Sequence, residues 1–173
     1  MQEKKMSKLV FVAALAALAS CGQNTDSQPV AGKLPRPRAA LESERASDKA
    51  IAFLNAYVAN CDKEKGMLSV EEWVSSSKLT TTRFKTELKK LLAEAYKEDP
   101  ELGLDADPIF DAQDYPDKGF ELDSFDSNTK YVVAKGKDWP DFKLTMKMVL
   151  ENNNWLVDGC GTINIPTAKR STR

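Results

Sequence analysis

The stretch from Asp105 to Asp123 (DADPIFDAQDYPDKGFELD) divides the chain into two halves with different hydrophobic patterns. Before it, apolar residues recur at three- and four-residue spacing, which is the period of an amphipathic helix. After it, apolar and polar residues alternate, most clearly from Phe142 to Glu151, as in a strand with one buried face. The sequence therefore predicts an α+β domain, in which N-terminal helices pack on a curved, four-stranded antiparallel sheet.

Three helices are expected in the first half. The first covers residues 41–60 and carries one apolar face. The second begins at a capping box made by Ser69 and Glu72 and ends near Ser75. The third begins within residues 80–82 and ends at Asp99, because the residue before a proline is steered away from helical angles.

Four strands are expected in the second half, over residues 120–123, 130–137, 142–151 and 155–165. Residues 152–154 are three asparagines, which suit a hairpin turn with positive φ. The last strand is expected to break or bulge at Gly159 and Gly161.

The first twenty residues have the pattern of a signal peptide. Three lysines precede an apolar run over residues 9–19, which is shorter than the roughly 20 residues that span a bilayer. The sequence LASC that ends at Cys21 resembles the lipobox of bacterial lipoproteins, which implies lipid attachment to Cys21. The expected divisions are a signal peptide (1–20), the lipidated cysteine with a flexible tether (21–40), the domain (41–166) and a basic tail (167–173).

The predicted location is the cell envelope, with the lipid anchor at Cys21 in the outer membrane. Gly22 follows the cysteine, in place of the aspartate that often marks retention at the inner membrane. The alternative is an ordinary secretory signal with a chance cysteine. Removing residues 1–20 takes away three lysines and one glutamate, so the formal charge falls from −1 to −3. This mildly acidic balance argues against a nucleic-acid partner.

Two cysteines remain when Cys21 is lipidated. In an exported protein such a pair favours a disulfide, here between Cys61 on the first helix and Cys160 on the last strand. It would be worth roughly 4–5 kcal/mol on the chain-entropy model. Two buried thiols are the alternative.

Histidine is absent from all 173 residues. This excludes the usual general base of triad hydrolases and the commonest zinc ligand, so only carboxylate or lysine chemistry is left for an enzyme. The aspartates of the dividing stretch suggest calcium, but their spacing does not match an EF-hand loop. We expect no metal and no cofactor.

The dividing stretch contains the motif D-P-x-x-x-A-Q-D-Y, formed by Asp107, Pro108, Ala112, Gln113, Asp114 and Tyr115. With the strand that follows, the motif resembles the domain of unknown function 3828, a family of bacterial, often lipidated, envelope proteins. The resemblance covers residues 47–166. It implies the cone-shaped fold of the nuclear transport factor 2-like (cystatin-like) superfamily and an envelope location, and it implies no reaction.

Four candidate ligand-binding residues form a polar rim at the expected open end of the cone: Asp107, Gln113, Asp114 and Tyr115. Trp139, at a strand boundary, is a further candidate that could supply a stacking surface. They favour a non-enzymatic binding module for a small polar ligand or a protein partner. Satisfying the backbone groups of a buried loop would explain Gln113 and Asp114 equally well. The alternatives are a carboxylate-based hydrolase of an envelope glycan, with Asp107 or Asp111 facing Asp114, and a periplasmic inhibitor or immunity-type protein.

Overall fold

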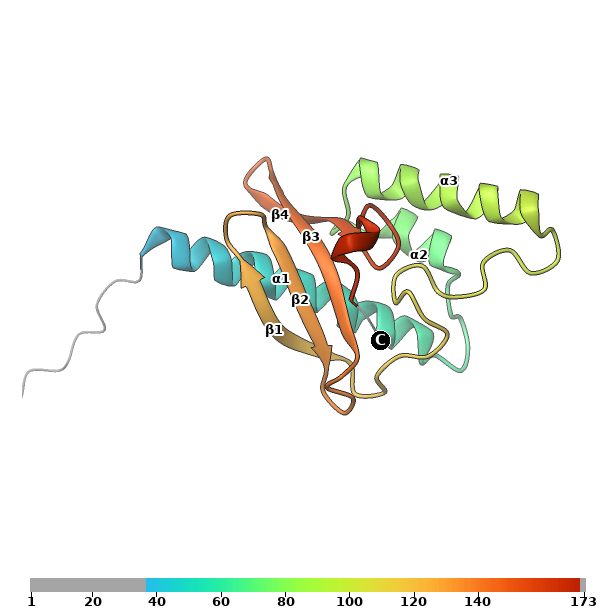
Figure 1. Cartoon of the computed structure of the whole chain (residues 1–173), viewed down its shortest axis with the longest axis horizontal. Helices are drawn as coiled ribbons and strands as arrows, with labels where there is room; N and C mark the ends of the chain where they lie inside the picture. The colour runs from blue at the N-terminus through green and yellow to red at the C-terminus, as the bar shows by residue number, and fades with distance from the viewer. Residues whose placement is uncertain (1–36, 172–173) are drawn as a thin grey trace, which may run out of the picture. The chain divides into compact units, whose positions relative to one another are not determined.

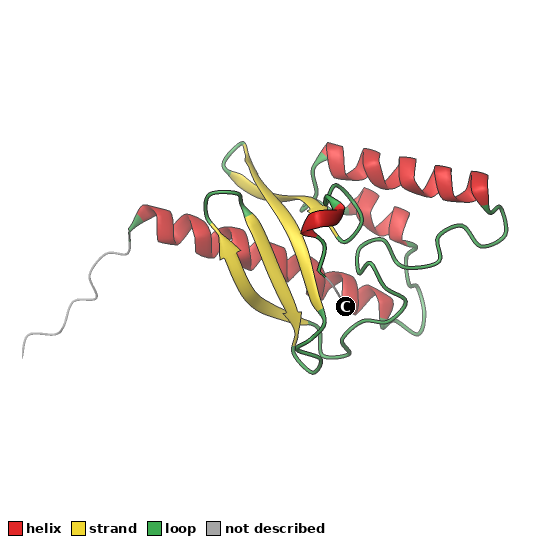
Figure 2. Ribbon diagram, in the orientation of Figure 1, coloured by secondary structure: helices red, strands yellow, loops and turns green. Residues whose placement is uncertain are grey.

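The structure, a computed structural model, describes residues 37–171. The expectations about the signal peptide, Cys21 and most of the tether fall on residues 1–36 and lie outside the described residues. Three helices precede four strands, as predicted (Figures 1 and 2): α1 (Arg38–Cys61), α2 (Val70–Ser76), α3 (Thr82–Glu98), β1 (Phe120–Asp126), β2 (Tyr131–Gly136), β3 (Lys143–Glu151) and β4 (Asn154–Cys160). Within this part of the chain, no helix is both long and apolar enough to cross a bilayer.

The first helix begins earlier than predicted. α1 starts at Arg38, inside the segment that we assigned to the tether, and Pro37 supplies the residue before its first turn. The fixed φ of proline suits that position, and Ala39 and Ala40 are strong helix formers. Arg38 also forms an ion pair with Glu42, one turn later, at 3.1 Å.

The other helix boundaries follow their capping residues. The side chain of Ser69 accepts a hydrogen bond from the Glu72 amide, and the Glu72 carboxylate accepts one from the Ser69 amide. These two bonds confirm the predicted capping box. Thr81 caps α3 through a hydrogen bond from the Phe84 amide.

The four strands form an antiparallel sheet in the order β1-β2-β3-β4, and α1 packs against all four. Asn152 and Asn153 both have positive φ in the β3–β4 hairpin, as predicted. β4 ends at Cys160 and not at residue 165, because Gly161 turns the chain with φ +58°. A bulge lies at Asp158, next to the glycine where we expected one.

The core lies between α1 and the inner face of the sheet. Phe53 and Leu54 of α1 and Leu144 and Met146 of β3 are fully buried there. Aromatic ring contacts continue through this layer, from Phe53 through Trp73 of α2, Tyr57, Phe110 and Phe120 to Phe142 and Trp139. Burying these large rings holds the helical layer on the sheet.

Within the described residues 167–171 of the expected basic tail, the chain forms a short helical turn and Arg170 and Ser171 bond back to the domain. Residues 167–169 form a 3₁₀ turn, and Arg170 donates to the carbonyl oxygens of Ile165 and Thr162, each at 3.1 Å. Ser171 lies 3.4 Å from the hydroxyl of Thr145 on β3. This cover explains why Thr145 is buried on a face that the alternation predicts to be wet.

Candidate functional site

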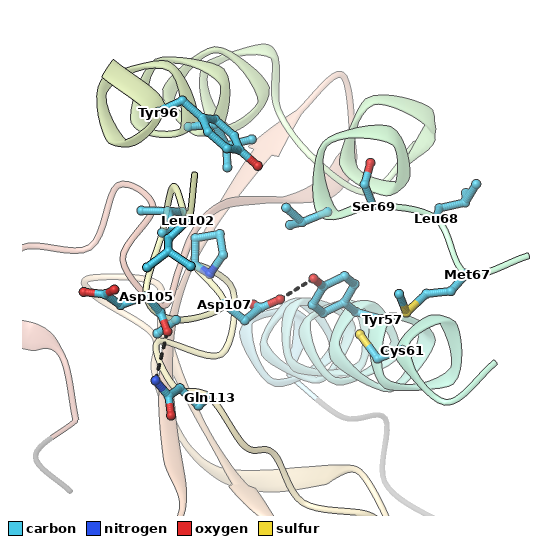
Figure 3. A pocket seen from close by; sticks show the side chains of 15 residues that line it. Tyr57, Cys61, Met67, Leu68, Ser69, Tyr96, Leu102, Asp105, Asp107 and Gln113 are labelled. Atoms are coloured by element: carbon cyan, nitrogen blue, oxygen red, sulfur yellow. Dashed lines mark hydrogen bonds between the residues drawn. The ribbon is translucent and has the colours of Figure 1, made fainter. Parts of the chain in front are cut away.

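A pocket of about 450 Å³ opens between the C-terminal end of α1, the start of α2, the end of α3 and the loop over residues 102–108 (Figure 3). Its rim carries four apolar side chains that are between 38% and 70% exposed: Met67, Leu68, Tyr96 and Leu102. They are half of the eight large apolar side chains that are exposed in residues 37–171. Such clustering of exposed apolar groups marks a binding surface more often than scattered ones do.

Tyr57 and Asp107 form the polar floor of the pocket. Tyr57 is buried on α1, and its hydroxyl donates to Asp107 Oδ2 at 2.5 Å (Figure 3). Asp107 Oδ1 accepts the amides of Ile109 and Phe110 at 2.8 and 2.9 Å. Both carboxylate oxygens are therefore engaged, and Asp107 joins the loop to the first helix.

Burial controls the titration of this floor. It raises the pKa of Asp107 above the ordinary value, although the bonds from Tyr57, Phe110 and Ile109 act in the opposite direction. Burial and the neighbouring Asp107 also raise the pKa of Tyr57. Burial, with Asp107 again nearby, raises the pKa of the Cys61 thiol to about 11, so Cys61 is a thiol and not a thiolate at neutral pH.

Two local devices position the apolar rim. The amide of Asn60, which is 2% exposed, donates to the Leu68 carbonyl at 2.9 Å and accepts from the Leu68 amide at 3.1 Å. Gly103 has φ +68° and lies against the Tyr96 ring, where a Cβ would come within 2.8 Å of a ring carbon. A larger residue at this position would therefore displace Tyr96 from the rim.

The end of β4 supports the turn that carries Asp107. Thr162 donates to the Pro108 carbonyl through both its amide and its hydroxyl, at 2.9 and 3.2 Å. At Gly161 a Cβ would lie 2.4 Å from the Pro108 and Ile109 carbonyl oxygens, so only glycine allows this close approach. The Asp-rich loop is therefore held by both the helical layer and the sheet.

The expected disulfide between Cys61 and Cys160 is absent from the structure, and the two thiols have different surroundings. Cys61 lines the pocket beside Tyr57 (Figure 3). Cys160 is fully buried, and its thiol donates to the Ile109 carbonyl at 3.4 Å. The Cys160 thiol is therefore bonded to the turn that carries Asp107, whereas Cys61 shares the pocket lining with Asp107 and Tyr57.

The structure gathers some of the predicted site residues and separates others. Asp107 and Gln113 line the pocket, where the Gln113 amide donates to the backbone oxygen of Asp105 at 3.1 Å. Asp114 is exposed and does not line it. Tyr115 stacks on Phe110 outside the pocket and donates to Asp62.

Trp139 also lies apart from the pocket. It occupies the β2–β3 connection, where its ring packs edge-on against Phe142 at 5.1 Å. Of the five candidate ligand-binding residues, only Asp107 and Gln113 line this pocket.

Sequence reasoning missed the apolar rim and Tyr57. Tyr57 follows the helical apolar period, so it reads as an ordinary core residue. One signal was present: Met67, Leu68 and Leu102 are large apolar residues in otherwise polar loops, where the fold does not need them. Their convergence depends on the packing of α2 and α3 around the end of α1.

The carboxylates of the hydrolase hypothesis do not all line this pocket. The hydrolase hypothesis needs Asp107 or Asp111 to face Asp114 across a cleft. Asp114 lies outside the pocket lining, and Asp111 sits at φ +53° in the turn. In residues 37–171, no three acidic or cysteine side chains are grouped as a metal site.

Comparisons of the chain with protein-family models, with curated proteins and with solved structures found no match. The resemblance to the domain of unknown function 3828 stays a prediction.

Proposed function

We propose that this chain is a non-enzymatic binding protein of the bacterial envelope, anchored by lipid at Cys21. In this proposal, the pocket at the end of α1 takes an apolar group of its ligand. One observation carries the proposal: half of the exposed large apolar side chains in residues 37–171 surround one pocket. Exposed apolar surface costs about 25 cal/mol per Å² in water, so a ligand that covers this rim gains affinity.

The pocket lining also limits the charge of the ligand. It includes the acidic residues Asp105 and Asp107 and no lysine or arginine. An anionic group would meet carboxylates with no cation to pair with, and that arrangement is unfavourable. The proposed ligand is therefore neutral or cationic where it enters the pocket.

The experiment is capture of the tagged chain from envelope extract, followed by mass spectrometry of the retained molecules. It compares the wild type with Leu102→Asp, which places a charge on the rim, and with Leu122→Asp, which changes an exposed leucine outside the pocket. A ligand retained by the wild type and by Leu122→Asp, but lost by Leu102→Asp, supports the proposal. Equal retention by all three proteins, or by none, contradicts it.

The anchor is tested separately with Cys21→Ser. The wild type is expected in the membrane fraction, with a diacylglyceryl group on the peptide that begins at Cys21. The variant is expected to lose that group. An unmodified Cys21 in the wild type would contradict the lipoprotein assignment and leave the pocket hypothesis intact.

A further inference from the structure

A second hollow region lies between the first half of α1 and the β3–β4 hairpin. It consists of two hollows of about 480 and 280 Å³, and both are lined by Arg45, Asn153 and Trp155. We call it the anchor-side groove, because it adjoins the end of α1 that follows the predicted tether. The lining of the pocket described above shares no residue with it.

Basic side chains follow one side of α1 along this groove. Arg38, Arg45 and Lys49 all line it, and their spacing places them within about 40° of one another around the helix. Glu42 pairs with Arg38, and Asp48 is the other carboxylate of the lining. Within residues 37–171, Arg45 and Lys49 take part in no ion pair, so both charges face solvent.

Two exposed leucines accompany these cations. Leu41 on α1 and Leu150 on β3 line the smaller hollow and are 44% and 48% exposed. Cationic side chains beside exposed leucines are the combination by which peripheral segments bind anionic bilayers: the charges meet headgroups and the apolar groups enter the boundary below them.

The position of the groove along the chain agrees with that partner. Fifteen residues lie between Cys21 and Pro37, and the flexible tether that the sequence predicts there would span about 20 Å on average. The tether leads directly into Arg38, at the edge of the groove. The ligand pocket lies at the other end of α1, and a helix of 24 residues is about 36 Å long.

We propose that the anchor-side groove is the face through which the domain rests on the anionic headgroups of a lipid bilayer. The apolar pocket shares no residue with this face, so it stays open to a ligand while the groove rests on the bilayer. The biological setting depends on the proposed anchor at Cys21, but the affinity of the groove for a bilayer does not.

The test uses the full-length chain with Cys21→Ser, so that acyl groups contribute nothing. Binding is measured by co-sedimentation with vesicles of phosphatidylcholine alone and with vesicles that also contain phosphatidylglycerol. The groove variant is Arg45→Glu with Lys49→Glu. Its matched control is Lys89→Glu with Lys97→Glu on the exposed side of α3, which makes the same change in net charge outside the groove. All three proteins share residues 1–36, so any binding by that segment cancels in the comparison.

The parent chain is expected to prefer the anionic vesicles, and this preference should weaken as salt is added. The groove variant should lose at least about tenfold in partitioning to anionic vesicles, because each basic residue near such a surface contributes of the order of a factor of five. The control should lose much less. Equal losses in both variants, or no preference in the parent, would overturn the proposal.

A further arm separates a bilayer from a soluble anion. Inorganic phosphate at constant ionic strength should leave vesicle binding unchanged. Selective competition by phosphate would show that the groove binds a small anion, and would also overturn the proposal. Neither a negative result in the ligand-capture experiment nor an unmodified Cys21 affects the vesicle measurements. This inference and the proposed function can therefore be refuted independently of each other.

Discussion

Replacing Asp107 tests the central junction of the site. In Asp107→Ala, three donors lose their acceptor: the hydroxyl of Tyr57 and the amides of Ile109 and Phe110. A hydrogen bond to a charged group contributes about 1.5–3 kcal/mol, and an unsatisfied buried donor costs about 1–3 kcal/mol.

These contributions do not add fully, since all three bonds converge on one carboxylate. We expect Asp107→Ala to lower the free energy of unfolding by about 3 kcal/mol. The measurement is urea denaturation followed by far-ultraviolet circular dichroism. Asp114→Ala is the matched control, because Asp114 is exposed and lies outside the pocket lining, and it should change stability by less than about 0.5 kcal/mol.

The pH dependence provides a second measurement of the same group. The pKa of Asp107 in the folded chain is raised above its ordinary value of 3.8, so folding takes up a proton between these two values. The stabilisation from this proton uptake is fully present below pH 3.8 and is lost as the pH rises through the folded pKa. In Asp107→Asn this dependence is absent, so the stability of the wild type relative to the variant should fall as pH rises through the window. Equal stability of the Asp107→Ala and Asp114→Ala variants, together with parallel pH profiles, would refute the role assigned to Asp107.

Three further predictions concern single positions. Thr80→Val should stabilise the domain by about 1 kcal/mol in denaturant titration, because the buried Thr80 hydroxyl has no partner in residues 37–171; a loss of stability would contradict this. Gly119→Ala should lower the free energy of unfolding by at least about 2 kcal/mol, because Gly119 has φ +73° and a Cβ there would lie 2.4 Å from the side-chain oxygen of Asn55 on α1. Gly66→Ala, with φ +72° and open space, should cost only about 1 kcal/mol, and similar losses would show that the contact is unimportant. Under native, non-reducing conditions an alkylating agent should label Cys61 slowly, and it should label Cys160 only after unfolding. If both cysteines stay unlabelled in the unfolded, unreduced chain, the two are joined by the disulfide that the sequence predicts.

The sequence alone determined the order and type of the elements. These signals depend only on residues close together in the chain, so one sequence is enough to detect them. They are the helical periodicity, the capping box at Ser69 and the alternation along β3. The hairpin at Asn152 and the turn at Gly119 were also predictable, because positive φ restricts the residues that can occupy such positions. These local patterns sufficed for an α+β domain with helices packed on a four-stranded antiparallel sheet.

Only the tertiary structure decided which side chains meet. Asp107 was a candidate from the start, but its bond to Tyr57 joins residues fifty positions apart and has no sequence signature. Met67, Tyr96 and Leu102 come from three separate segments, so no local pattern reveals that they meet on one rim. Trp139 packs against Phe142, apart from that rim. Local propensity fixes helices and strands, whereas a site depends on the packing of elements whose contacts are distant in sequence.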